Sequence, residues 1–117
     1  MRHLDEQKRI LESHVKQIAL VCRDAIRAKY PTARIVLYGS YARGQAGPES
    51  DLDLLVLLDE DVTPEKKRII RDMLYDIGLA EDFVISVIIR SVEKWNSPIS
   101  QAMLLYRIIQ QEGIQVA

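Results

Sequence analysis

The chain has 117 residues, of which 48% are hydrophobic and 28% charged. This balance is typical of a globular protein and excludes the disordered and fibrous classes, and the length predicts a single domain over residues 1–117. Sixteen Lys and Arg residues against seventeen Asp and Glu give a net charge of -1, so nucleic acid is not an expected partner. The polar N-terminus is unlike a signal peptide, and no apolar run approaches the roughly 18 residues of a membrane span. We expect a cytoplasmic protein with no membrane partner.

The first half of the chain predicts one helix and two strands. Apolar residues at spacings of three, four and seven predict a long amphipathic helix from about residue 4 to 29, ended by Tyr30-Pro31. The β-prone residues 34–38 predict a first strand, and residues 51–58 predict a second strand that is buried on both faces. Between them, residues 40–43 should form one helical turn closed by Gly44, after which the chain reverses. The residues expected at the reversal are Gly47 and Pro48.

The second half predicts a helix, a strand and a last helix. Thr63-Pro64 is a start signal for a helix that Gly78 should end, and residues 83–89 predict a third, largely buried strand. Ser97-Pro98 should open the last helix, and Gly113 should close it. The order of elements predicts an α/β (α+β) fold with a small mixed sheet flanked by helices. The side chains expected on the core face of the last helix are Ile99, Met103, Tyr106 and Ile109.

A glycine-serine turn and a carboxylate pair lie on either side of the connection between the first two strands. Asp51 and Asp53 are two residues apart where a strand begins, so their side chains should project together. Such carboxylates repel each other unless water or a cation lies between them, and Mg²⁺ or Mn²⁺ is the oxygen-seeking cation that also binds phosphates. Gly39 allows close approach of a phosphate, Ser40 offers a hydroxyl at the start of a helical turn, and Arg43 could reach a phosphate one turn later.

Plainer interpretations compete with these functional ones. Ser40 is also a favoured helix N-cap, Arg43 a common surface residue, and the two aspartates common solvent-facing residues at a strand end. Their combination beside an otherwise apolar strand favours a nucleotide and metal site. Trp95 is a candidate of another kind, because it could either anchor an interface or pack against the last helix.

The motif resembles a known family. Residues 37–44 (LYGSYARG) followed by residues 50–56 (SDLDLLV) are similar to the signature of the minimal, single-domain branch of the DNA polymerase β-type nucleotidyltransferase superfamily. The resemblance implies that fold, with the glycine-serine pair holding the triphosphate of a nucleotide, ATP foremost, and the spaced carboxylates binding Mg²⁺ and carrying catalysis. The residues that match are Gly39, Ser40, Asp51 and Asp53.

One feature of the family pattern is missing from this chain. The resemblance implies a third carboxylate on the next core strand, which acts in the metal site and as a general base. Residues 83–90 contain no acid. Glu81 and Asp82, which precede them, either substitute for it or form a charged, exposed loop. Without a base, transfer would be slow, would depend on a partner or would be absent.

The same branch is similar to the antitoxin half of two-gene modules whose other half is a small, all-helical HEPN protein, often a ribonuclease toxin. The resemblance implies neutralisation either by transfer of AMP from ATP to a tyrosine hydroxyl of that partner or by binding alone. We therefore expect an Mg²⁺-dependent nucleotidyltransferase that acts as an antitoxin, with an inactive or weak enzyme that binds its partner as the alternative. Transfer to a small molecule such as an aminoglycoside is disfavoured because no second domain is expected to hold it. The acceptor and the base preference stay open, and a homo-oligomer is compatible with the chain.

Overall fold

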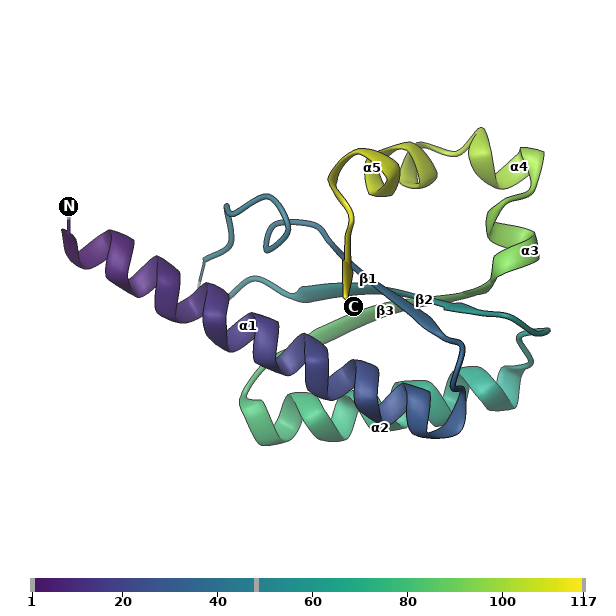
Figure 1. Ribbon diagram of the computed structural model, residues 1–117, viewed down its shortest axis with the longest axis horizontal. Helices are drawn as coiled ribbons and strands as arrows, with labels where there is room; N and C mark the ends of the chain where they lie inside the picture. Colours follow the sequence, from purple (N-terminus) through teal and green to yellow (C-terminus); the bar gives the residue numbers. More distant parts are fainter. Residues whose placement is uncertain (1, 48, 117) are drawn as a thin grey trace.

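The computed structural model describes residues 2–47 and 49–116, and the side chains of residues 12–47 and 49–116. Figure 1 shows a sheet with α1 and α2 on one side and α3, α4 and α5 on the other. Within the described residues, no helix combines the length and the apolar character needed to cross a membrane. The elements in chain order are α1 (Arg2–Lys29), β1 (Arg34–Tyr38), β2 (Leu52–Leu58), α2 (Pro64–Glu81), β3 (Ile85–Ser91), α3 (Val92–Trp95), α4 (Pro98–Gln101), α5 (Leu104–Glu112) and β4 (Ile114–Val116).

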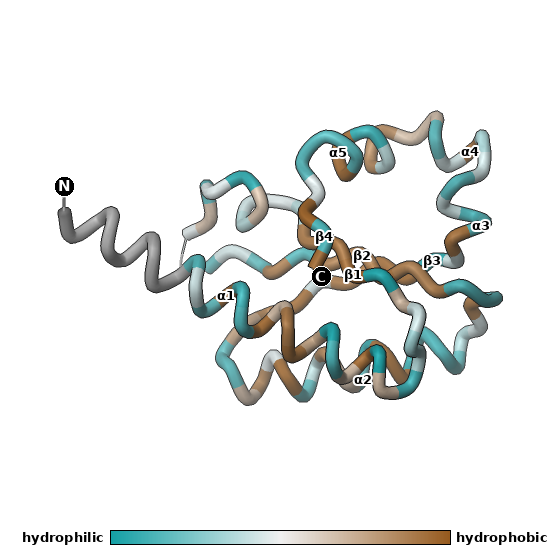
Figure 2. The backbone as a smooth tube through the Cα atoms, in the orientation of Figure 1, coloured by the Kyte–Doolittle hydropathy of each residue, from teal (hydrophilic) through white to brown (hydrophobic). Residues whose placement is uncertain are grey.

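The sheet has the strand order β3-β2-β1-β4 over the described residues. β1 pairs antiparallel with β2 and with β4, and β2 pairs parallel with β3. This mixed sheet with flanking helices confirms the predicted fold class. Figure 2 shows the apolar residues concentrated on the strands and on the helix faces toward them.

The central strand β2 supplies side chains to both layers. Leu54, Val56 and Leu58 belong to the core beneath α1 and α2, whereas Leu55 and Leu57 belong to a second core beneath α3 and α5. All five are buried, as the apolar sequence of this strand predicts. The strand alternation therefore defines two faces, and every second residue of β2 points toward α5.

The helix α1 ends where the sequence predicts. Its last residue is Lys29, and Tyr30 follows with its N–H bonded to the Ile26 carbonyl at 2.8 Å. Burial raises the pKa of the Cys22 thiol to about 12, as expected for a thiol that packs as a small apolar group. Leu4 and Leu11, which also fit the predicted stripe, lie outside the residues whose side chains are described. The stripe residues that are described and buried are Val15, Ile18, Cys22 and Ile26.

The predicted end of α2 is wrong, although its start is confirmed. The Thr63 hydroxyl accepts from the Lys66 N–H at 3.2 Å, but the helix continues past Gly78 to Glu81, and Asp82 closes it in the left-handed conformation with φ 58°. A Cβ at position 78 would lie 2.5 Å from the Phe83 carbonyl oxygen. Gly78 thus serves the close approach of the chain leaving the helix, and not its termination.

The predicted third strand begins and packs differently. β3 starts at Ile85 and not at residue 83, and only Ile89 and Ser91 of this strand are buried. The strand lies at one edge of the sheet, with only β2 beside it, and so has less cover than β2. Val84, expected inside the strand, is 65% exposed.

The predicted last helix, expected between Ser97 and Gly113, is two short helices, α4 and α5, and a further short helix, α3, precedes it. Ser91 and Ser97 each accept a bond from the backbone N–H three residues later, which starts α3 and then α4. Met103 has extended backbone and separates α4 from α5. Of these two helices, α5 supplies the side chain, Ile109, that packs with Leu55 and Leu57 of the sheet. Ile99 and Met103, predicted as core residues, are exposed. Compared with the predicted order of elements, the structure has α3 and β4 in addition, and α4 is a helix separate from α5.

Trp95 packs inside the molecule. It is 6% exposed, and its ring lies 5.0 Å from that of Tyr106 between ring centroids. With Ile109 it covers Leu55 and Leu57 of the sheet. Of the two interpretations of Trp95, packing against the last helix is confirmed, and an interface anchor is not supported.

Candidate functional site

The register of β1 and β2 brings the glycine-serine turn against the carboxylates. Tyr38 at the end of β1 pairs with Asp53 near the start of β2, so Gly39 follows directly beside the Asp53 side chain. Gly39 has φ 81°, and a Cβ built on it would overlap the Asp53 carboxylate. Only glycine allows both the turn and the position of this carboxylate.

The Asp53 carboxyl lies within the electrostatic influence of several charged groups. Burial raises the pKa of the Asp53 carboxyl, and the charge of Asp51 raises it further, whereas Arg43 lowers it and Glu112 raises it. Asp51 is exposed, and its charge, after burial, also raises the pKa of the Tyr41 hydroxyl. Four groups from residues 41–53 and one from the end of α5, Glu112, thus share one electrostatic environment.

The raised pKa of Asp53 predicts a pH-dependent cost in stability when no metal is bound. In the pH range between the ordinary and the raised pKa, the folded chain holds a proton that the unfolded chain has lost, so stability falls as pH rises through the folded-state pKa. Asp53→Asn should therefore raise the melting temperature at neutral pH, and the gain should shrink in acid. Thermal unfolding followed by circular dichroism without Mg²⁺ measures it. Asp59→Asn, at the other end of β2, is the control; an Asp53→Asn gain that is absent or equal at all pH values would contradict the interpretation.

The turn after Gly39 has the predicted form. The Arg43 N–H bonds to the Gly39 carbonyl at 3.1 Å, and the Gln45 N–H bonds to the Ser40 carbonyl at 2.9 Å. Gly44, with φ 69°, ends this single turn. Ser40 is half-buried at the start of it. At the predicted reversal, Pro48 lies outside the described residues.

A carboxylate that the sequence did not indicate, Glu112, completes the cluster. Its Oε2 lies 2.9 Å and its Oε1 3.2 Å from Nη1 of Arg43, and Oε1 also accepts from the Gly39 N–H at 3.3 Å. Glu112 is the last residue of α5, the helix on the side of the sheet toward which Asp53 and Leu55 point. No local pattern distinguishes this glutamate, because acids near helix ends are common.

The residue beside Asp53 on the next strand is a serine. β3 runs parallel to β2, and Ser86 is the Cα partner of Asp53, so both side chains project from the same face. The two acids before the strand have other neighbours. Glu81 lies 3.7 Å from Nε2 of His14, and Asp82 is the C-cap of α2.

The residues present fit a divalent cation bound by two carboxylates. Asp51 and Asp53 supply hard oxygen ligands. The backbone of Gly39 lies close beside the Asp53 carboxylate, with no side chain between them. Among the side chains that the structure describes, no group of three or more His, Cys, Asp and Glu residues could hold a metal. Phosphate oxygens and water would therefore complete the shell of Mg²⁺ here, as they often do.

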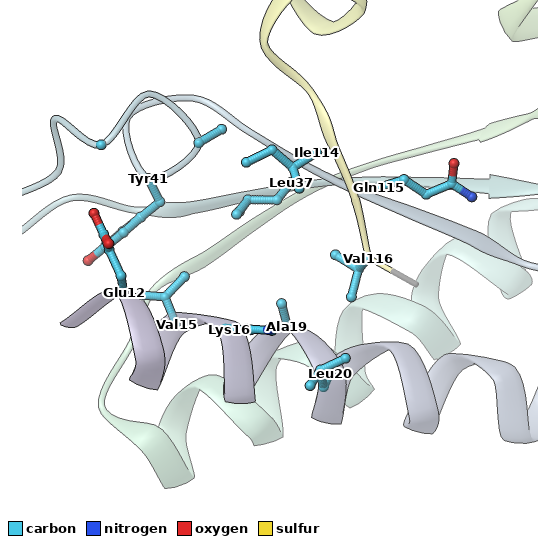
Figure 3. A pocket seen from close by; sticks show the side chains of 12 residues that line it. Glu12, Val15, Lys16, Ala19, Leu20, Leu37, Tyr41, Ile114, Gln115 and Val116 are labelled. Carbon is cyan, nitrogen blue, oxygen red and sulfur yellow. The ribbon is translucent and has the colours of Figure 1, made fainter. Parts of the chain in front are cut away.

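An apolar cavity of about 650 Å³ lies on the other side of the same turn, between α1 and β4. Figure 3 shows Val15 and Ala19 of α1 facing it, with Leu37, Ile114 and Val116 from the strands. The carboxylates and Arg43 are not among the residues that line it. This cavity is separate from the charged cluster.

Comparison with protein families identifies the fold. The family described as "Nucleotidyltransferase domain" matches residues 20–109. The chain belongs to this nucleotidyltransferase family. It is thus a transferase by family, and the resemblance based on the glycine-serine and Asp-x-Asp motif is confirmed.

Relatives of this nucleotidyltransferase domain include several proteins of Methanocaldococcus jannaschii named "Putative protein adenylyltransferase". One is 36% identical over 87 residues, which cover 72% of this chain and 79% of that protein. A second is 35% identical over 80 residues, covering 68% and 75%. A bifunctional uridylyltransferase/uridylyl-removing enzyme of Rhodospirillum rubrum is 42% identical over 48 residues, 38% of this chain and 5% of that enzyme.

Solved structures share the fold of this nucleotidyltransferase domain. A crystal structure of a toxin-antitoxin with AMP-PNP has a TM-score of 0.58 and 20% identity, and the match covers 91% of this chain and 72% of that one. A crystal structure of a mutant toxin-antitoxin MntA-HpeT has a TM-score of 0.52 and 21% identity, covering 79% and 66%. At these identities the likeness concerns the fold alone, and it confirms the predicted nucleotidyltransferase fold.

Proposed function

We propose that this chain transfers AMP from ATP, with Mg²⁺, to a tyrosine hydroxyl of a helical, HEPN-type toxin and so acts as an antitoxin. The observation that carries the proposal is the contact of Gly39 with Asp53 at one end of the sheet, beside Asp51 and Arg43. The names of the relatives support adenylyl transfer to protein, and the solved neighbours support a toxin partner and a nucleotide.

Different residues of the cluster would bind the phosphate oxygens and the metal ion of a bound triphosphate. The Gly39 N–H and the Arg43 guanidinium are donors suited to phosphate oxygens, and the Ser40 hydroxyl lies at the start of the same turn. Asp51 and Asp53 would hold Mg²⁺, which when bound offsets negative charge on the α-phosphate and on the leaving pyrophosphate.

The proposed reaction forms one bond and breaks one. The tyrosine oxygen attacks the α-phosphorus, the bond from the α-phosphorus to the bridging oxygen breaks, and pyrophosphate leaves. The tyrosine proton needs an acceptor, and Ser86, beside Asp53, is not a base at neutral pH. The toxin or solvent would have to accept it, which predicts slow transfer.

The position of Ser86 also favours a second function, neutralisation of the toxin by binding alone. A serine in place of the third carboxylate removes the general base but leaves Gly39, Asp51 and Asp53 able to hold a nucleotide. In this alternative the chain keeps the nucleotidyltransferase fold as a binding module.

Labelling separates the two functions. The chain and the product of its neighbouring gene, incubated with Mg²⁺ and ATP labelled at the α-phosphate, should yield a labelled partner, whereas ATP labelled at the γ-phosphate should not. An unlabelled partner that is nevertheless neutralised would favour binding alone. Label from the γ-phosphate would overturn the proposal, because it indicates phosphoryl transfer.

A further inference from the structure

The end of α5 places a carboxylate on two donors that the proposed function assigns to the triphosphate. Glu112 accepts from the Gly39 N–H at 3.3 Å and from Arg43 Nη1 at 2.9 and 3.2 Å. α5 and the turn after β1 are far apart in the sequence but lie on the same side of the sheet (Figure 1). A carboxylate and a phosphate offer the same chemistry to these donors, namely negatively charged oxygens.

The contact with Gly39 and Arg43 holds the Glu112 carboxylate near other negatively charged side chains. Its side chain is 15% exposed, against 45% for Arg43, and its charge raises the pKa of Asp53. A third carboxylate beside Asp51 and Asp53 is unfavourable by itself. Its attraction to Arg43 and to the Gly39 N–H offsets that repulsion, which marks these two donors as an anion-binding position.

The backbone around Glu112 explains how it reaches the turn. Gly113 follows it and packs so closely on β1 that a Cβ there would lie 2.8 Å from Cγ1 of Val36. β4 then pairs with β1, with Ile114 opposite Leu37. Glu112 is therefore placed by the junction of α5 and β4, while its contacts with the turn are made by its side chain and tie the end of α5 to that turn.

We propose that Glu112 occupies the phosphate position of the nucleotide-free chain and that a triphosphate binds by displacing it. This proposal rests on the proposed function for its ligand. The apparent affinity for a triphosphate is then the intrinsic affinity multiplied by the fraction of molecules in which Glu112 leaves the donors free. The end of α5 acts as an internal competitor for the site.

Glu112→Gln tests the competition. Glutamine keeps the length of the side chain but not its charge, so inorganic tripolyphosphate with Mg²⁺ should bind about tenfold more tightly to the variant, because a charge-assisted contact no longer competes. Isothermal titration calorimetry measures the affinity. Glu93→Gln, an exposed acid on α3, makes the same change in net charge and should bind as the wild type does.

Binding of tripolyphosphate tests the proposal for Glu112, and binding of AMP-PNP tests the proposed function. Equal or weaker binding of tripolyphosphate by Glu112→Gln, or no binding by either form, overturns the competition and indicates that Glu112 only orients Arg43. If AMP-PNP binds to neither form, the proposed function fails, while a tenfold gain for tripolyphosphate still supports an anion site that Glu112 covers.

Hydrogen exchange of the wild-type chain provides a second test, which decides the matter if Glu112→Gln does not fold. Saturating tripolyphosphate should speed exchange in residues 111–114, because the contact that ties the end of α5 to the turn is broken. Unchanged or slower exchange there would show that Glu112 stays in place, and the proposal would be wrong.

Discussion

Asp53→Asn should lower the rate of AMP transfer to the partner more than about 100-fold, because loss of a group that only supports a metal ligand already costs up to about that much. The amide keeps the shape of the side chain beside Gly39 but removes a negatively charged ligand for Mg²⁺. The pKa of Asp53 is raised by burial and by Asp51, so the loss of charge should not weaken the fold. Transfer and stability should therefore change in opposite directions.

The measurement is initial-rate labelling of the partner from α-labelled ATP, with melting curves for each variant. Asp59→Asn is the matched control, since Asp59 is exposed and lies beyond the other end of β2. If Asp53→Asn transfers AMP at the wild-type rate, the metal site does not depend on this carboxylate, and the assignment is wrong. If transfer is lost but the toxin is still neutralised, the chain acts by binding.

Ser86→Asp should raise the rate of AMP transfer about 100-fold, at the low end of what a positioned general base contributes. Ser86 pairs with Asp53 across the parallel strands β3 and β2 and projects from the same face. An aspartate there would place a strand carboxylate beside Asp51 and Asp53, where it could accept the tyrosine proton and bind Mg²⁺. Repulsion among these acids and Glu112 should also lower the melting temperature without Mg²⁺, and added Mg²⁺ should restore it.

Ser86→Asn is the matched control, because it has the size of aspartate without its charge and should transfer AMP as slowly as the wild type. The same labelling assay compares the two variants, with AMP-PNP binding to show that each still holds nucleotide. If Ser86→Asp binds nucleotide normally but gains nothing over Ser86→Asn, the third strand does not supply the base, and the proton must leave by another route.

The elements that the sequence predicted well are those with strong local signals. The long apolar stripe of α1, the β-prone residues of β1 and the cap Thr63 are each patterns that can be recognised within one stretch of the chain. The errors came where contacts made outside the element decide. Gly78 resembles a helix end but is needed for the approach of Phe83, and Ile99 fits a core stripe but lies on a helix that never reaches the sheet.

Within the site, the sequence and the tertiary structure contributed different groups. Gly39, Asp51 and Asp53 were recognisable because their spacing depends on one turn between two strands, which is local in the chain. Neither Glu112 nor the pairing of Ser86 with Asp53 could be read from spacing. Both depend on which strands are neighbours and on which face of the sheet α5 covers.

By itself the sequence determined the family and the class of chemistry and predicted the residues suited to a triphosphate and a metal, because a short motif with special backbone needs carries that information. The tertiary structure alone decided what surrounds the motif: Glu112 on the donors of Gly39 and Arg43, and a serine in place of the third acid. The physical reason is that electrostatic interactions depend on distance in space, and the chain brings these groups together from segments that the sequence separates.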